Sequence, residues 1–206
     1  MANINNPTAQ IFDRSRQKEK KRQAVILEGA LAFSENGYAG TTLDMLADRL
    51  GVSKKALYHY VSGKSQILFE IFQLWLDLQE EAIDQAESHN DNSEAKLRTY
   101  VRAYIGSVYS HFVPMDRIVG ELETLPDEQI AAIQKRRREN DARLARLFES
   151  GAGAEFAEWE PRYAIHALNG AIDWIFKWLK PGGSVVPEQA ADKIMDILVR
   201  GLATRA

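Results

Sequence analysis

The sequence predicts an all-α protein of about nine helices, with a small N-terminal helix-turn-helix domain and a larger helical domain after it. Two observations carry this prediction. Apolar residues recur at helical spacing along most of the chain, whereas the alternating pattern of a β-strand is nearly absent. Proline, glycine and polar clusters interrupt the apolar pattern where helices would end. A length of 206 residues, 45% of them hydrophobic, suits one or two folded domains.

The N-terminal third contains three predicted helices. The first is expected over 16–36 and ends at an Asn-Gly pair, a common helix stop. Thr42 is a good N-cap for a second helix over 43–50, whose apolar residues fall at i, i+3, i+4 and i+7. A tight Gly-Val-Ser turn then leads to a third helix over 54–61. A helix, a three-residue turn and a second helix form a helix-turn-helix unit.

Six more helices are predicted in the rest of the chain. Prolines mark the first turns of several of them, and glycines mark their ends. They are expected over 64–88, 93–112, 116–124, 126–150, 158–180 and 187–204.

Charge is divided unevenly along the chain. The net charge is −3, yet residues 1–65 carry 10 Lys and Arg against 6 Asp and Glu. Much of this excess lies in the run DRSRQKEKKR at 13–22. A basic end suits a polyanionic partner, although the same run also fits a solvated start of a helix.

Several classes of function are not expected. The chain has no cysteine, which excludes disulfides, thiolate metal sites and a cysteine nucleophile. Its four histidines lie on separate segments, and no GxSxG or phosphate-binding glycine loop occurs. We therefore expect no enzyme, no metal site and no cofactor. The uncharged stretch 103–115 is shorter than the roughly 20 residues of a membrane span, and the polar N-terminus is unlike a secretory signal, so a cytoplasmic protein without a membrane partner is expected.

The region around the predicted turn resembles the DNA-binding domain of TetR-family transcriptional regulators. The resemblance extends over about 55 residues without a gap, and it rests on ENGYAGTTLDMLADRLGVSKKALYHYVSGKSQIL. It includes Tyr38 after the glycine of the first helix, the Thr41-Thr42 pair, Gly-Val-Ser, Leu-Tyr-His-Tyr and the lysine that opens the fourth helix. The resemblance implies a flexible arm over 1–15, a DNA-binding domain over 16–65 and an effector-binding and dimerisation domain over 66–206.

Eight residues are candidates for contact with double-stranded operator DNA. Burial of Leu57 leaves polar side chains of the third helix facing outward, where they suit a major groove. By the resemblance, Thr42, Tyr60 and Lys64 would contact phosphates, although Tyr60 also fits the core. The groove-facing candidates are Ser53, Lys54, Lys55, Tyr58 and His59.

The basic segment before the first apolar positions is a further candidate for DNA contact. We expect it to follow the DNA backbone or to enter the minor groove, and the alternative is a mobile tail without a specific role. Its basic residues are Arg14, Arg16, Lys18, Lys20, Lys21 and Arg22.

The segment GELETLPDEQIAAIQKRRREN resembles the acyl-CoA-responsive regulators of fatty-acid, sterol and aromatic-acid breakdown. This subgroup resemblance implies an acyl-CoA effector, and an arginine near the pocket would suit its phosphates. Three arginines are consecutive and cannot all face inward. Arg137 is our candidate because it lies four residues after Ile133, and solvent exposure of all three arginines is the alternative. Asn140 departs from the aromatic residue of many relatives, which weakens the inference about the ligand.

Nine residues are candidates for effector binding. The helix over 93–112 presents aromatic rings, hydroxyls and an imidazole, a mixture that suits either a pocket or an ordinary core. A cationic or neutral hydrophobic drug is the alternative effector, and Glu121, Glu123 and Asp173 would serve it. The candidates are Tyr104, Val108, His111, Phe112, Glu121, Leu122, Arg137, His166 and Trp174.

The last two helices are expected to form a homodimer interface, because small and aliphatic residues recur on them. Trp174 and Trp178 share a face that fits the pocket, the core or the interface. The expected function is that of a dimeric repressor released from operator DNA by a small molecule. Nonspecific DNA compaction is disfavoured by the acidic C-terminal portion. The interface candidates are Ala167, Leu168, Ala171, Ile175, Ile194, Ile197, Leu198 and Gly201.

Overall fold

The computed structural model describes residues 7–89, 91–111, 118–149, 160–179 and 183–200. Within these ranges the chain is helical, and no strand occurs. The elements are α1 (Pro7–Gly40), α2 (Leu43–Arg49), α3 (Lys54–Leu57), α4 (Lys64–Ser88), α5 (Ser93–His111), the 3-10 helix η2 (Val119–Thr124), α6 (Asp127–Glu149), α7 (Pro161–Trp178) and α8 (Pro187–Arg200). The all-α prediction is confirmed.

Three helices differ from the prediction in their start, length or type. α1 begins at Pro7 instead of Arg16, so most of the segment predicted as a flexible arm is helical. α3 is a regular α-helix only over Lys54–Leu57, and tighter turns follow it as far as Val61. The helix predicted over 116–124 is present as the 3-10 helix η2.

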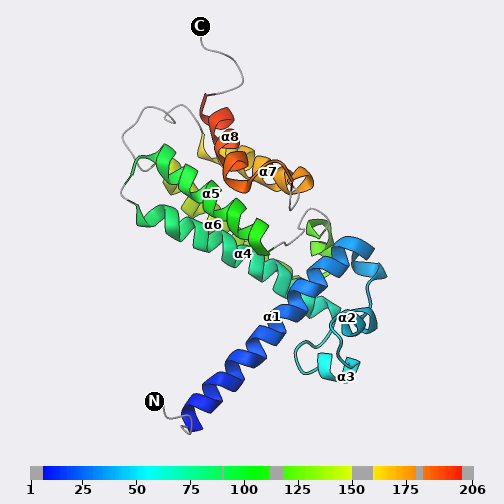
Figure 1. Cartoon of the computed structure of the whole chain (residues 1–206). Helices are drawn as coiled ribbons and strands as arrows, with labels where there is room; N and C mark the ends of the chain where they lie inside the picture. Colours follow the sequence, from blue (N-terminus) through cyan, green and yellow to red (C-terminus); the bar gives the residue numbers. More distant parts are fainter. Residues whose placement is uncertain (1–6, 90, 112–117, 150–159, 180–182, 201–206) are drawn as a thin grey trace.

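Helix α4 joins the two parts of the molecule. It packs against α1 at one end and against α5 and α6 along the rest of its length, while α7 and α8 lie beyond α5 (Figure 1). Its apolar residues recur at helical spacing and are buried from its first turns almost to its end. They are Ile67, Leu68, Ile71, Phe72, Trp75, Leu76, Leu78, Ala82, Ile83 and Ala86.

The crossing of α1 and α4 depends on a glycine. A Cβ atom added to Gly29 would overlap Cγ2 of Ile67, so only glycine allows this close approach. Arg22 adds an ion pair to Glu70 of α4 at 2.5 Å. The N-terminal part is therefore held to α4 by both packing and charge.

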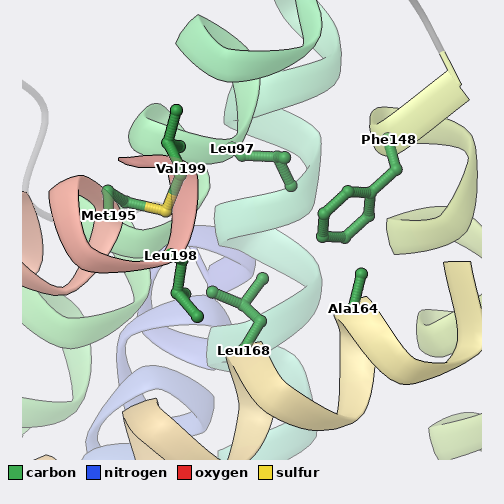
Figure 2. Close-up of a pocket in the computed structure, with 7 residues that line it drawn as sticks. All are labelled: Leu97, Phe148, Ala164, Leu168, Met195, Leu198 and Val199. Atoms are coloured by element: carbon green, nitrogen blue, oxygen red, sulfur yellow. The ribbon is translucent and has the colours of Figure 1, made fainter. Parts of the chain in front are cut away.

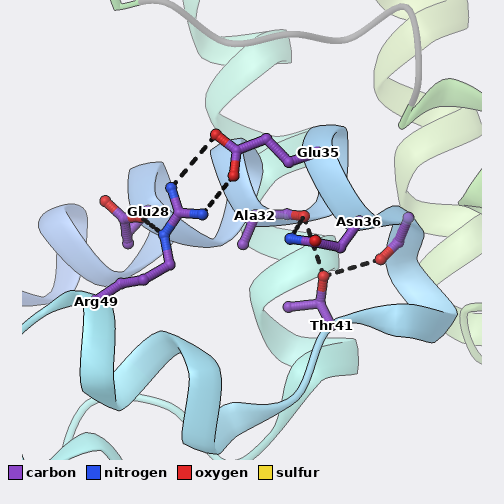
Figure 3. A network of polar contacts seen from close by, with 7 residues as sticks. Glu28, Ala32, Glu35, Asn36, Thr41 and Arg49 are labelled. Atoms are coloured by element: carbon purple, nitrogen blue, oxygen red, sulfur yellow. Dashed lines mark hydrogen bonds and ion pairs between the residues drawn. The ribbon is translucent and has the colours of Figure 1, made fainter.

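Thr41 fixes the end of α1. Gly37 adopts a positive φ of 74°, which breaks the helix, and the Thr41 hydroxyl turns back beneath it. This hydroxyl is buried and lies 2.9 Å from the carbonyl oxygen of Gly37 and 3.1 Å from that of Ala32, so it donates to either of them. Asn36 also donates to the Ala32 carbonyl, as Figure 3 shows. The backbone therefore enters α2 in a fixed direction.

Candidate nucleic-acid interface and effector cleft

The helix-turn-helix is shaped by two hydroxyl caps and one glycine. The Thr42 hydroxyl accepts a hydrogen bond from the Met45 amide, and the Ser53 hydroxyl accepts one from the Ala56 amide, both at 3.2 Å. Gly51 has a φ of 65° in the turn between them. Thr42 and Ser53, both candidates for DNA contact, thus also stabilise the starts of α2 and α3.

The polar side chains of α3 and of the turn after it are exposed. Leu57 is buried and anchors this segment to the core. Lys54 is exposed and donates to Asp44 of α2 at 2.8 Å. Tyr60 is half-buried against the core, which agrees with its alternative assignment. The exposed residues are Ser53, Lys54, Lys55, Tyr58 and His59.

Lys64 has partners within the fold. Its ammonium group donates to the carbonyl oxygen of Tyr38 at 2.7 Å and lies 4.6 Å from the centre of the Tyr38 ring. It therefore connects the first turn of α4 to the end of α1. Its predicted contact with a phosphate stays a prediction.

Arg49 is a residue that the sequence analysis did not single out. Its guanidinium forms ion pairs with Glu28 and Glu35, both on α1 (Figure 3). These pairs hold α2 against α1, beside the hydrogen bonds of Thr41. The spacing of Glu28 and Glu35, seven residues apart on one side of a predicted helix, was the signal that could have revealed the contact.

An open cleft lies among α4, α5, η2, α6 and α7. Its empty volume is about 690 Å³, including the part that is open to solvent. Arg137 lies over the ring of Trp75, with 5.1 Å between the guanidinium carbon and the ring centre. Of the effector candidates, Tyr104 and Arg137 line this cleft. The full lining is Trp75, Leu76, Gln79, Tyr104, Val119, Arg137, Asp141, Asn169 and Asp173.

The charges in the cleft are mixed. Asp141 and Asp173 face the single guanidinium of Arg137 among the lining residues. Desolvation raises the pKa of both carboxyl groups, and the positive charge of Arg137 opposes this by lowering it. Burial likewise raises the pKa of Tyr104 well above its usual range, so its hydroxyl stays protonated. The cleft can therefore attract an anionic group through Arg137 or a cationic group through its carboxylates.

Arg136 and Arg138, the neighbours of Arg137 in the sequence, are not among the residues that line the cleft. Arg136 donates to Gln73, Asp77 and Glu80 of α4 at 2.5, 2.6 and 3.0 Å. Arg138 is exposed to solvent.

Asn140, which stands where many relatives have an aromatic residue, is buried among polar partners. Its amide donates to Gln79 at 2.9 Å, and Gln79 in turn donates to the Tyr100 hydroxyl at 3.1 Å. Because Gln79 lines the cleft, this chain of hydrogen bonds fixes one part of the cleft wall.

The other effector candidates lie away from the cleft lining. Val108 is buried in the core, and Glu121 and Leu122 are half-buried on η2. His166 and Trp174 are exposed on α7 and are not among the lining residues, and their role in effector binding stays a prediction. The side chain of His111 and all of Phe112 lie outside the described residues.

A second, smaller hollow is entirely apolar. It has an empty volume of about 300 Å³ and lies among α5, α6, α7 and α8 (Figure 2). Two of the interface candidates, Leu168 and Leu198, line it. The other lining residues are Leu97, Phe148, Ala164, Met195 and Val199.

The outer surface of α7 and α8 is rich in exposed apolar side chains. Leu168 and Ile175 point into the core instead, so placing them on the interface was wrong. Ala167 is exposed, Ala171, Ile194 and Leu198 are partly exposed, and Gly201 lies outside the described residues. The large exposed apolar residues on these two helices are Tyr163, Trp174, Trp178 and Ile197.

No helix within the described residues is long and apolar enough to cross a membrane.

Comparison with known proteins agrees with this architecture. Residues 26–71 match the family model "Bacterial regulatory proteins, tetR family", and residues 90–202 match "Tetracyclin repressor-like, C-terminal domain". The repressor KstR2 of Rhodococcus jostii is 23% identical over 91% of this chain and 93% of that protein. The activator FasR of Mycolicibacterium smegmatis is 26% identical, over 56% of this chain and only 52% of FasR.

A solved structure of AibR, in complex with isovaleryl coenzyme A and operator DNA, superposes with a TM-score of 0.72. It is 28% identical, and the match covers 86% of this chain and 98% of the AibR chain. The first model covers the helix-turn-helix. The second covers more than half of the whole chain. The chain therefore belongs to the TetR family of bacterial transcriptional regulators.

Proposed function

We propose that the chain is a homodimeric repressor that binds operator DNA and is released by an acyl-CoA thioester bound in the cleft around Arg137. In this proposal the exposed surface of Ser53, Lys54, Lys55, Tyr58 and His59 enters the major groove. Two such surfaces of a dimer would meet successive major grooves about 34–36 Å apart. Contact with DNA also implies that the protein acts in the cytoplasm.

The observation that carries the choice of effector is the position of Arg137. Of three consecutive arginines, Arg136 is bound to α4 and Arg138 faces solvent, which leaves Arg137 to meet a ligand in the cleft. A guanidinium binds phosphate and thioester oxygens well, and the aromatic wall suits an acyl group. The AibR structure with isovaleryl coenzyme A supports this choice.

Effector binding would reach the DNA-binding part through α4. Trp75, Leu76 and Gln79 of α4 line the cleft, while Lys64 at the start of the same helix binds the end of α1. A ligand that favours another position of α4 would shift α1 with it, because the Gly29–Ile67 approach leaves no space between them. The recognition surfaces of the dimer would then no longer match the groove spacing.

A cationic or neutral hydrophobic effector is the second candidate. It is favoured by Asp141 and Asp173, whose two carboxylates outnumber the one guanidinium of the cleft. Such a ligand would lie against Trp75 with its positive group near the carboxylates. An acyl-CoA thioester is anionic and the second candidate is cationic or neutral, so the two are separable by experiment.

The first test is thermal unfolding of the purified dimer with a panel of ligands. The panel contains acyl-CoA thioesters of several chain lengths, free CoA, free fatty and aromatic acids, and cationic dyes. A ligand at 100 times its Kd should stabilise the protein by about 2.7 kcal/mol. Stabilisation by one class of thioester but not by free CoA supports the proposal, whereas stabilisation by dyes alone overturns it in favour of the second candidate.

The second test measures DNA release. An operator is selected from a random duplex library with the purified protein, and its Kd is measured with and without the stabilising ligand. The proposal expects the ligand to weaken binding, and a ligand that strengthens binding would indicate an activator or a corepressor mechanism instead. Lys55→Ala and Tyr58→Ala should weaken operator binding without changing the thermal response to the ligand.

A further inference from the structure

The N-terminal part of α1 extends beyond the body of the molecule. α1 begins at Pro7, 18 residues before Val25, and this part is about 27 Å long at 1.5 Å per residue. Its first buried side chain among the described ones is Val25, and residues 16–21 before it are exposed. Figure 1 shows this part of α1 as a rod that projects from the helices around it. A rod of this length without a core needs another reason to be helical.

The rod carries two groups of basic residues on different sides. A helix turns by about 100° per residue, so Lys18 and Lys21 lie on one side and Arg16 and Lys20 on another, about 150° away. We call Lys18 and Lys21 the basic stripe.

The basic stripe lies on the side of α1 that faces the helix-turn-helix. Lys21, Glu28 and Glu35 follow one another at intervals of seven residues, so they lie along one side of the helix. Glu28 and Glu35 bind Arg49 of α2. The stripe therefore continues, beyond the edge of the domain, the same side of α1 that holds α2.

The lysines of the stripe are not neutralised within the part of the chain that the structure describes. Arg22 forms ion pairs with Glu19 and Glu70. Glu19, the acidic residue next to Lys18, is therefore already paired. Lys18 and Lys21 form no ion pair with a described residue, and neither do Arg16 and Lys20. Unpaired lysines on a rigid rod repel one another unless a polyanion is present.

We propose that the basic stripe binds the sugar-phosphate backbone of the DNA that flanks each operator half-site. The proposal rests on the DNA-binding function and adds a second, sequence-independent contact to that of α3. A helix about 10–12 Å wide does not fit a minor groove about 6 Å wide, so phosphates are the target. Of the six basic residues predicted to meet DNA, Arg22 is bound within the protein and Arg16 and Lys20 face away.

The test compares two matched double variants of the full-length dimer, Lys18→Ala/Lys21→Ala and Arg16→Ala/Lys20→Ala. Each removes two charges from exposed positions of the same helix, so neither should alter folding. Binding is measured on a selected operator trimmed to its core and on the same operator with about ten more base pairs at each end. The salt dependence of binding is recorded for both duplexes.

The proposal expects the wild-type dimer to prefer the flanked duplex. Lys18→Ala/Lys21→Ala should lose this preference and retain its affinity for the core. Its log–log salt slope on the flanked duplex should fall by about 0.9 for each phosphate that is no longer neutralised, hence by about 3.6 per dimer. Arg16→Ala/Lys20→Ala should retain most of the preference.

Equal effects of the two double variants, or a wild-type protein indifferent to the flanks, would overturn the proposal. Failure of the DNA-binding function itself looks different. In that case the wild-type protein selects no operator from the library, and Tyr58→Ala binds duplex DNA as well as the wild type does.

Discussion

Arg137 lies over the ring of Trp75, with its guanidinium carbon 5.1 Å from the ring centre, at the wall of the cleft between α4 and α6. The indole N–H of Trp75 is buried and has no hydrogen-bond partner among the described residues. An arginine held over an aromatic ring still has N–H groups that can donate to a ligand. The pair thus offers an apolar wall and several donors in one place.

Arg137→Gln should abolish the thermal stabilisation by an anionic effector. The glutamine keeps a polar side chain but loses the positive charge and the forked donors. Arg138→Gln is the matched control, because it removes the same charge from the next residue, which is exposed. Ligand titration calorimetry should show a loss of affinity of at least tenfold, about 1.4 kcal/mol, for the first variant alone. Equal losses in both variants would mean that only the general charge of α6 matters.

Asp173→Asn should raise the thermal stability of the protein at pH 7. Desolvation raises the pKa of Asp173, so the folded state binds its proton more tightly than the unfolded state does. Such a group stabilises the fold at low pH, and this stabilisation is lost as the pH rises through the raised pKa. The gain from the asparagine should therefore be largest at pH 7 and shrink as the pH falls toward 4.

Asp192→Asn provides the control with the opposite sign. Its hydrogen bonds to Arg102 lower the pKa of Asp192, so the charged form stabilises the fold above pH 4. Asparagine should therefore lower the melting temperature at pH 7. If both asparagine variants shift the melting temperature in the same direction between pH 4 and pH 8, desolvation of Asp173 does not explain the effect of Asp173→Asn.

Much of the fold was readable from local chemistry. The Thr42 cap and the Gly-Val-Ser turn have specific side-chain and backbone requirements, and the structure has both where the sequence predicts them. The start of α1 was not readable, because few apolar residues precede Val25 and periodicity is the main signal. Thr41 had no predicted role beyond the resemblance, yet it is buried and its hydroxyl reaches the carbonyl oxygens at the end of α1.

The sites were readable only in part, because periodicity shows that a helix has an apolar side but not what covers it. On α7 this left Leu168 and Ile175, which are buried in the core, indistinguishable from the exposed Trp174. Arg137 was singled out by spacing, and the structure has it in the cleft lining. Its role in binding an effector stays a prediction. Asp141 escaped notice because nothing in its local sequence shows that α4, α5 and α7 surround it.

Gly29→Ala should destabilise the protein, although alanine is the better helix former. Its Cβ would overlap Cγ2 of Ile67, a stiff β-branched side chain, and α1 would have to move away from α4. Overpacking of this kind costs about 1–3 kcal/mol. Gly106→Ala on α5 meets no described atom within 4 Å and should stabilise the fold by about 0.5–1 kcal/mol. Urea unfolding of both variants checks this, and two changes of the same sign would contradict the close approach of α1 and α4.

Trp174→Glu should convert the dimer to a monomer. Trp174 is 62% exposed on α7 in the single chain, and Tyr163, Trp178 and Ile197 are exposed on the same two helices. A carboxylate at the centre of an apolar interface would be buried without a partner, which costs several kcal/mol. Light scattering after size exclusion should give a mass near 23 kDa instead of twice that value.

Leu168→Ala is the control variant. It enlarges the apolar hollow inside the chain, so it should lower stability by about 2–5 kcal/mol and leave the mass of the folded dimer unchanged. A Trp174→Glu protein that stays dimeric would show that the subunits meet through another face, and a monomer that still binds operator DNA with full affinity would separate dimerisation from recognition.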